Sequence, residues 1–80
     1  MINPTWPSPE LEAIVPSDTV EYSKPLRQIY VGIGGDVTVV DQKDNVILFS
    51  DVPYGFYITP IYIKQVKATG TTAQNMVGFF

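Results

Sequence analysis

Few side chains in this 80-residue chain have the types and the spacing that catalysis requires. The chain contains neither His nor Cys, so the usual base and the most reactive nucleophile of covalent catalysis are missing. A Ser23-Lys24 pair remains, but neighbouring residues of an extended strand point to opposite faces. We therefore expect no catalytic residues and no enzymatic activity.

The run Gly32-Ile33-Gly34-Gly35 has the composition of a phosphate-binding loop. Such a loop binds phosphate because a helix N-terminus follows it and offers free backbone amides. Here residues 37–40 are Val, Thr, Val and Val, which favour a strand. Two alternating, β-branched stretches on either side of a Gly-Gly pair predict a tight β-hairpin instead.

The acidic residues Asp41, Asp44 and Asp51 offer the oxygen ligands that Ca²⁺ prefers. They lack the alternating spacing and the central Gly of an EF-hand, and Asp44-Asn45 is a common turn pair. Zinc would find only carboxylates, because His and Cys are absent. A glycosidase-type carboxylate pair would need a sugar cleft, for which so small a chain has little room. We expect neither a metal nor a cofactor.

The elements that would position these residues are short strands. We expect them over residues 27–33, 37–40, 45–50, 61–68 and 73–79, and we expect almost no helix. About six or seven strands in one chain of this size indicate an all-β fold, a small antiparallel β-sandwich or barrel. In the strand at 27–33, alternation places Ile29, Val31 and Ile33 on one face.

Two strands carry more specific expectations. Residues 46–49 are apolar on both faces, which predicts burial on both faces, the second beneath the chain's own N-terminal arm or another subunit. In the strand at 61–68, Ile61 and Ile63 share one face while Val66 and Ala68 fall on the other. A β-bulge near Lys64-Gln65 would bring all four to the core.

Residues 1–11 differ in composition from the rest of the chain. They contain Pro4, Pro7 and Pro9, which remove backbone donors and exclude this stretch from a sheet interior. We expect an extended Pro-rich N-terminal arm at 1–11 and a single β domain at 12–80. The arm is either a disordered terminus or a segment that lies on a neighbouring subunit, and the single tryptophan, Trp6, favours the second interpretation.

Charge and hydropathy exclude several classes of partner. The net charge is −3 and no basic cluster is present, so we expect no nucleic-acid partner. No apolar run reaches the roughly 20 residues that span a bilayer, and the first residues lack the features of a signal peptide. A domain of this size buries only about 60% of its unfolded surface, so partner subunits are the natural source of further burial.

Aromatic residues are the remaining candidates for a functional surface. Tyr54, Phe56, Tyr57 and Tyr62 surround one loop and the strand after it, and the chain ends in Phe79-Phe80. Such rings anchor an interface or stack on sugars, and exposed terminal phenylalanines would favour aggregation unless packed on the sheet or into a neighbour. The predicted interface residues are Trp6, Tyr54, Phe56, Tyr57, Tyr62, Phe79 and Phe80.

With these segments in place, residues 13–80 resemble a family of small phage structural proteins whose members include the head spike base protein of a gene transfer agent. The resemblance is carried, in chain order, by Ser17-Asp18, Pro25, Arg27, Tyr30-Val31-Gly32, Gly35-Asp36-Val37, Val52-Pro53-Tyr54-Gly55, Pro60 and Thr69-Gly70-Thr71-Thr72-Ala73. The family has no catalytic residues to carry over.

The resemblance implies a protein located in the virion that assembles and mounts a spike, a fibre or a component attached to the capsid or tail. We expect a homo-oligomer, a trimer or a pentamer, with other virion proteins such as capsid or fibre as partners. The alternative is a carbohydrate- or receptor-binding module of a phage particle, which would use the aromatic residues of the loop.

Overall fold

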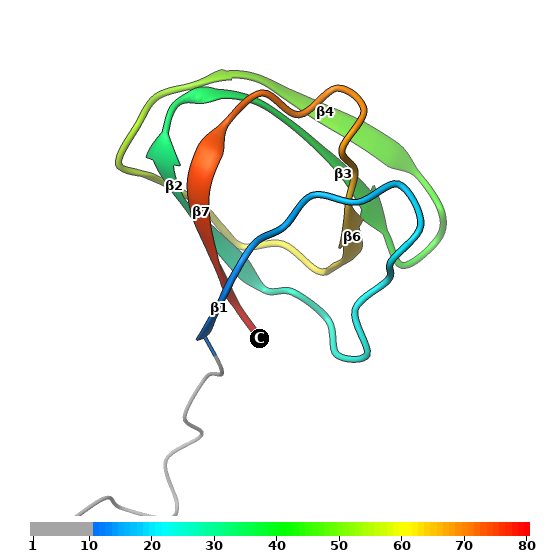
Figure 1. The fold of residues 1–80 in the computed structure, drawn as a ribbon. Helices are drawn as coiled ribbons and strands as arrows, with labels where there is room; N and C mark the ends of the chain where they lie inside the picture. The colour runs from blue at the N-terminus through cyan, green and yellow to red at the C-terminus, as the bar shows by residue number, and fades with distance from the viewer. Residues whose placement is uncertain (1–10) are drawn as a thin grey trace, which may run out of the picture.

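A computed structural model describes residues 11–80, which form two antiparallel β-sheets (Figure 1). The strands of this part are β1 (Leu11–Ala13), β2 (Gln28–Ile33), β3 (Gly35–Asp41), β4 (Val46–Val52), β5 (Phe56–Ile58), β6 (Ile63–Val66) and β7 (Gln74–Phe79). One sheet has the order β1-β7-β2-β5 and the other the order β4-β3-β6. The described residues contain no helix, so the predicted all-β fold is confirmed.

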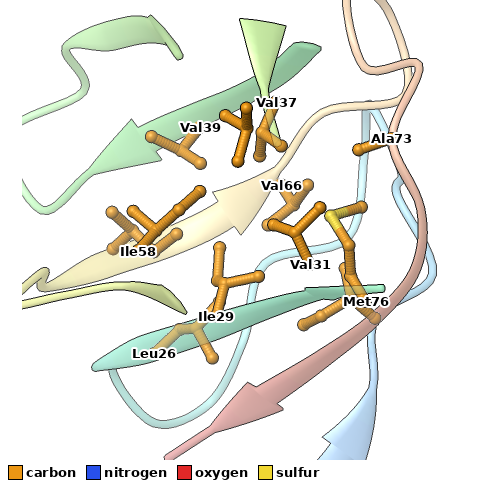
Figure 2. Close-up of a cluster of buried hydrophobic side chains, with 12 residues drawn as sticks. Leu26, Ile29, Val31, Val37, Val39, Ile58, Val66, Ala73 and Met76 are labelled. Carbon is orange, nitrogen blue, oxygen red and sulfur yellow. The ribbon is translucent and has the colours of Figure 1, made fainter. Parts of the chain in front are cut away.

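The core lies between the two sheets and is built from the inward residues of their central strands (Figure 2). Ile29 and Val31 of β2 face Val37 and Val39 of β3, and all four are at most 2% exposed. Leu26, just before β2, pairs with Ile63 through two backbone hydrogen bonds of 2.8 and 3.0 Å. This bridge joins the sheets along one side, so the packing has features of both a sandwich and a barrel.

The Gly34-Gly35 hairpin is a wrong prediction. β2 and β3 do not pair with each other, because β2 belongs to the four-stranded sheet and β3 to the three-stranded one. The chain crosses from one sheet to the other at Gly34, and a Cβ there would lie 2.5 Å from the Val52 carbonyl oxygen. Ile33, predicted to share the core with Ile29 and Val31, is 47% exposed at this crossing.

Residues 11–80 do not bury β4 on both faces, so the predicted cover of its second face by the N-terminal arm or another subunit stays a prediction. Val46, Ile47 and Leu48 are 58%, 44% and 54% exposed. β4 is the edge strand of the three-stranded sheet and pairs only with β3, so only Phe49 and Val52 reach the core. Alternation reports which residues share a face, but not how far a strand lies from the centre of its sheet.

The bulge near Lys64-Gln65 is confirmed. Val40 pairs with Gln65 but Asp41 pairs with Ile63, so Lys64 is the extra residue on β6. Ile63 and Val66 are consequently both buried, and Ile61 packs against the core. Ala68, the fourth residue predicted for the core, is exposed.

Candidate assembly surface

The Thr-rich turn of residues 69–73 is the point where segments distant in sequence meet. Asp18 accepts hydrogen bonds from the Thr69 amide at 3.0 Å and the Thr69 hydroxyl at 2.7 Å, across 51 residues of sequence. These two bonds hold the pKa of the Asp18 carboxyl below its ordinary value. The Thr38 amide donates to the Thr71 hydroxyl at 3.0 Å, and the Thr38 hydroxyl donates to the Gly70 carbonyl at 2.9 Å.

Another segment that carries the resemblance, Gly35-Asp36-Val37, forms hydrogen bonds with the same turn. The Asp36 amide donates to the Thr72 hydroxyl at 2.9 Å, and the Thr72 amide donates back to the Asp36 carbonyl at 2.9 Å. The Asp36 carboxylate accepts from the Asp51 amide at 3.0 Å. Three of the segments that carry the resemblance therefore hold the turns of the sandwich together through hydrogen bonds.

Two of the three carboxylates considered for calcium, Asp41 and Asp44, have partners at the β3–β4 hairpin. Asp41 accepts from the Lys43 amide at 2.8 Å and the Asn45 amide at 2.9 Å, and the Asn45 side-chain amide binds its second oxygen at 3.0 Å. The Asn45 bonds keep the pKa of Asp41 below its ordinary value. Asp44 pairs with Lys64, whose pKa is raised mainly by this bond.

Other features considered for chemistry lie apart from one another. Ser23 and Lys24 are in a bend, not a strand, and line a pocket of about 270 Å³ with Glu12, Tyr22 and Phe80. Within residues 11–80, no group of three potential metal ligands is found. In the same range, no helix is long and apolar enough to cross a membrane.

An apolar surface covers the outer side of the four-stranded sheet. The register places Ala13, Val77, Tyr30 and Tyr57 in one row across all four strands. Leu11, Phe79 and Gln28 form the adjacent row. We call these seven residues the aromatic face: Leu11, Ala13, Gln28, Tyr30, Tyr57, Val77 and Phe79.

Three rings of the aromatic face contact one another. The Tyr30 and Tyr57 rings have centroids 5.0 Å apart at an interplanar angle of 56°, and those of Tyr57 and Phe79 are 6.4 Å apart at 51°. Tyr57 is 49% exposed and Leu11 59%, while Tyr30 and Phe79 are half-buried. This tilted arrangement leaves aromatic surface open to solvent on an ordered sheet.

The other predicted interface residues are distributed around this face. Tyr62 is 59% exposed and lines, with Phe79 and Pro60, a pocket of about 440 Å³ that adjoins the face. Tyr54 and Phe56, 80% and 48% exposed, lie in and after the β4–β5 connection. Trp6 lies outside the described residues.

The C-terminal phenylalanines pack on the sheet, as expected, but in different environments. Phe79 belongs to β7 and lies on the aromatic face. Phe80 packs against the core, and its ring meets Tyr22 edge-on at 5.2 Å. Burial raises the pKa of the Tyr22 hydroxyl, with a further contribution from the Glu12 charge.

Sequence reasoning did not find Tyr30, Val77, Leu11 and Ala13 as surface residues. Tyr30 alternates with the buried Ile29 and Val31, so its outward position was readable from the sequence. Its meeting with Tyr57 and Phe79 was not readable, because it depends on which strands are neighbours. Leu11, the last residue of the predicted arm, lies in β1 and forms the edge of this face.

Comparisons with known proteins give one clear result. No protein-family model matches the chain, and no curated protein matches it either. A similar chain lies in the solved structure of the capsid of a native gene-transfer-agent (GTA) particle, computed with C5 symmetry. That chain is 30% identical in sequence to the present one, and the two folds match with a TM-score of 0.79. The match covers 92% of the present chain and 84% of the GTA chain. The present chain therefore belongs to the same family as that GTA capsid chain and is a structural protein of a phage or gene-transfer-agent virion.

Proposed function

We propose that this chain assembles into a homo-oligomeric ring, a pentamer or a trimer, that serves as the base on which a spike, fibre or other component is mounted on the virion. The C5 symmetry of the particle that contains the similar chain supports a ring of five. The resemblance of residues 13–80 to head spike base proteins supports the mounting role. Binding to other virion proteins, such as capsid or fibre, follows from that role.

The observation that carries the proposal is the edge strand β4. Seven residues long, it pairs with β3 on one side only. Its other edge presents unpaired backbone groups, and three consecutive side chains, Val46, Ile47 and Leu48, are 44–58% exposed. An exposed apolar edge of this length pairs with another chain unless it is protected, and no Pro or Lys interrupts β4. We expect this strand to contribute the contact between subunits.

The test is the oligomeric state of the purified chain by native mass spectrometry and light scattering. The wild-type chain is expected to form an oligomer, and Leu48→Lys is expected to weaken its association at least about tenfold, since it places a charge in an apolar contact. The matched control is Val20→Lys, which places the same charge at an exposed apolar residue outside β4. A wild-type chain that stays monomeric at every concentration would reject the proposal.

A second candidate function, binding of a carbohydrate or receptor, is supported by Tyr54. This ring is 80% exposed in the β4–β5 connection, close in sequence to the exposed Phe56 and Tyr57. Exposed aromatic rings stack on sugar rings. Glycan-array binding that is lost in Tyr54→Ala, with the oligomer intact, would favour this function.

A further inference from the structure

The aromatic face is an uncharged apolar surface that no described part of the chain covers. Its seven residues include no Asp, Glu, Lys or Arg. Tyr57 and Leu11, at opposite edges of the sheet, are each about half exposed. A charged partner such as a nucleic acid or an acidic peptide finds no counter-charge there. An uncharged apolar segment needs no counter-charge and can bind through apolar contacts.

The chemistry of this face matches a Pro-rich segment. Polyproline II segments dock on surfaces lined with aromatic side chains, since the proline rings pack against the aromatic rings and the stiff segment loses little entropy. The backbone carbonyls of such a segment have no internal donors. The Tyr30 and Tyr57 hydroxyls and the Gln28 amide are donors that could satisfy them.

The chain itself contains one such segment, residues 4–9. It reads Pro4-Thr5-Trp6-Pro7-Ser8-Pro9 and carries no charged side chain. Each proline fixes its own φ and biases the residue before it toward extended backbone. We propose that residues 4–9 of one subunit bind the aromatic face of a second copy of this chain, with Trp6 in the adjoining pocket lined by Phe79 and Tyr62; this inference rests on the proposed self-assembly.

Chain geometry favours a second copy over the segment's own subunit. Only Glu10 separates Pro9 from Leu11, which is itself part of the aromatic face. Six of the seven residues 3–9 are prolines or precede one, which favours extended backbone, so we expect no reversal onto the segment's own sheet within the one residue Glu10. Six residues of polyproline II extend about 19 Å. Four strands about 4.8 Å apart span about 14 Å, so the segment can cross the whole face of a neighbour.

The adjoining pocket has room for a large ring. It has a volume of about 440 Å³ and is lined by Arg27, Pro60, Tyr62 and Phe79 among others. The Arg27 guanidinium, which donates to the Phe80 carbonyl at 3.1 Å, is held at this pocket and offers a cation–π contact to an indole. Trp6 supplies the indole and would be the anchor of the interface.

The test uses Trp6 as the single fluorescent reporter and full-length variants throughout. Tyr57→Lys disables the face and keeps Trp6, while Trp6→Ala disables the arm, keeps the face and is silent in tryptophan emission. In the wild-type chain, Trp6 emission is expected to shift to the blue as concentration rises. Tyr57→Lys alone should lack the shift, and adding excess Trp6→Ala should restore it, because the Tyr57→Lys arm then finds an intact face in trans.

The matched control is Val20→Lys, which places the same charge at an exposed residue outside the aromatic face and should shift like the wild-type chain. Circular dichroism of each variant checks the fold. The inference is overturned if the Tyr57→Lys emission still shifts to the blue as concentration rises. It is also overturned if the wild-type emission is equally blue at every concentration, including those at which the chain is monomeric. An oligomer that forms without any shift overturns the inference and leaves the proposed assembly standing. A chain that never associates overturns both.

Discussion

At the residue scale, one short turn holds several segments of the fold. Asp18, which precedes β2, and Asp36 and Thr38 of β3 all bond to residues 69–73. Thr38 is 7% exposed although it points away from the core, because this turn covers it. The threonine hydroxyls of the turn thus act as hydrogen-bond partners for backbone groups that no strand satisfies.

A substitution at Gly35 tests the close approach of β3 to the turn of residues 69–73. A Cβ on Gly35 would lie 2.7 Å from the Thr72 hydroxyl oxygen and 2.8 Å from the Ala73 amide nitrogen. Gly35→Ala is therefore expected to destabilise the fold by about 1–3 kcal/mol through overpacking, measured by urea denaturation. Gly55→Asn is the control, because nothing lies within 4 Å of a Cβ there and Asn tolerates the positive φ of 74°. Equal stability of Gly35→Ala and the wild-type chain would contradict the contact.

Asp18 gives a prediction for pH. Its pKa is lowered below the ordinary value of 3.8 by the two Thr69 bonds. A lowered pKa in the folded state adds stability above the ordinary pKa, and this stability is lost as the pH falls through the folded value. The stability difference between the wild-type chain and Asp18→Asn should therefore be largest near neutral pH and shrink below 3.8. A difference that stays constant down to about pH 2 would show that the ionised carboxylate contributes nothing.

At the element scale, the described strands divide into central strands and edge strands. β2, β7 and β3 each have a neighbour on both sides, and they supply seven of the fifteen buried side chains of the described residues. β1, β4, β5 and β6 are the edge strands of the two sheets. The exposed apolar residues of β4 and of the aromatic face therefore lie where a partner can reach them.

Hydrogen exchange distinguishes these strands. Amides of β3, between β4 and β6, are expected to exchange slowest at every concentration, because they lie in the centre of a sheet. Amides of β4 that face away from β3 should become protected only as the protein associates. If β4 protection is independent of concentration while the oligomer forms, the subunit contact lies elsewhere on the molecule.

The end of β7 is part of the fold as well as of the surface. The Phe79 carbonyl accepts from the Arg27 amide at 2.8 Å, and Phe80 packs against Tyr22. Deleting Phe79 and Phe80 should therefore lower the stability of dilute, unassociated subunits by about 2–4 kcal/mol, as well as weaken the oligomer. Thermal unfolding at low concentration measures the first effect. An unchanged melting temperature would mean that both rings act only in assembly.

At the scale of the whole molecule, a small core is combined with eleven exposed large hydrophobic side chains among the described residues. The buried hydrophobic residues form one cluster between the sheets, while large side chains such as Val15, Leu48 and Tyr54 are 54–80% exposed. Single exposed apolar residues are ordinary, but contiguous ones mark interaction surfaces. We therefore expect this surface to become further buried when the subunit assembles.

The melting temperature should consequently depend on protein concentration. Association stabilises the folded subunit by mass action, so a tenfold rise in concentration adds about 1 kcal/mol per subunit for a ring. For a chain of this size that raises the melting temperature by about 4–8 °C. Leu48→Lys should move this dependence to higher protein concentrations, and Val20→Lys, outside β4, should not. A melting temperature that is the same over a hundredfold range would contradict assembly of the isolated protein.

The sequence by itself determined the local properties of this protein. Alternating β-branched residues predicted the strands, and the spacing of Ile63 and Val66 predicted the bulge at Lys64. The lack of His and Cys argued against covalent catalysis. Only the tertiary structure decided that Gly34 crosses between sheets, that β4 is an edge and that Tyr30, Tyr57 and Phe79 share one face. Side-chain alternation depends on neighbouring residues, whereas strand partners are chosen by contacts between residues far apart in the chain, such as Asp18 and Thr69.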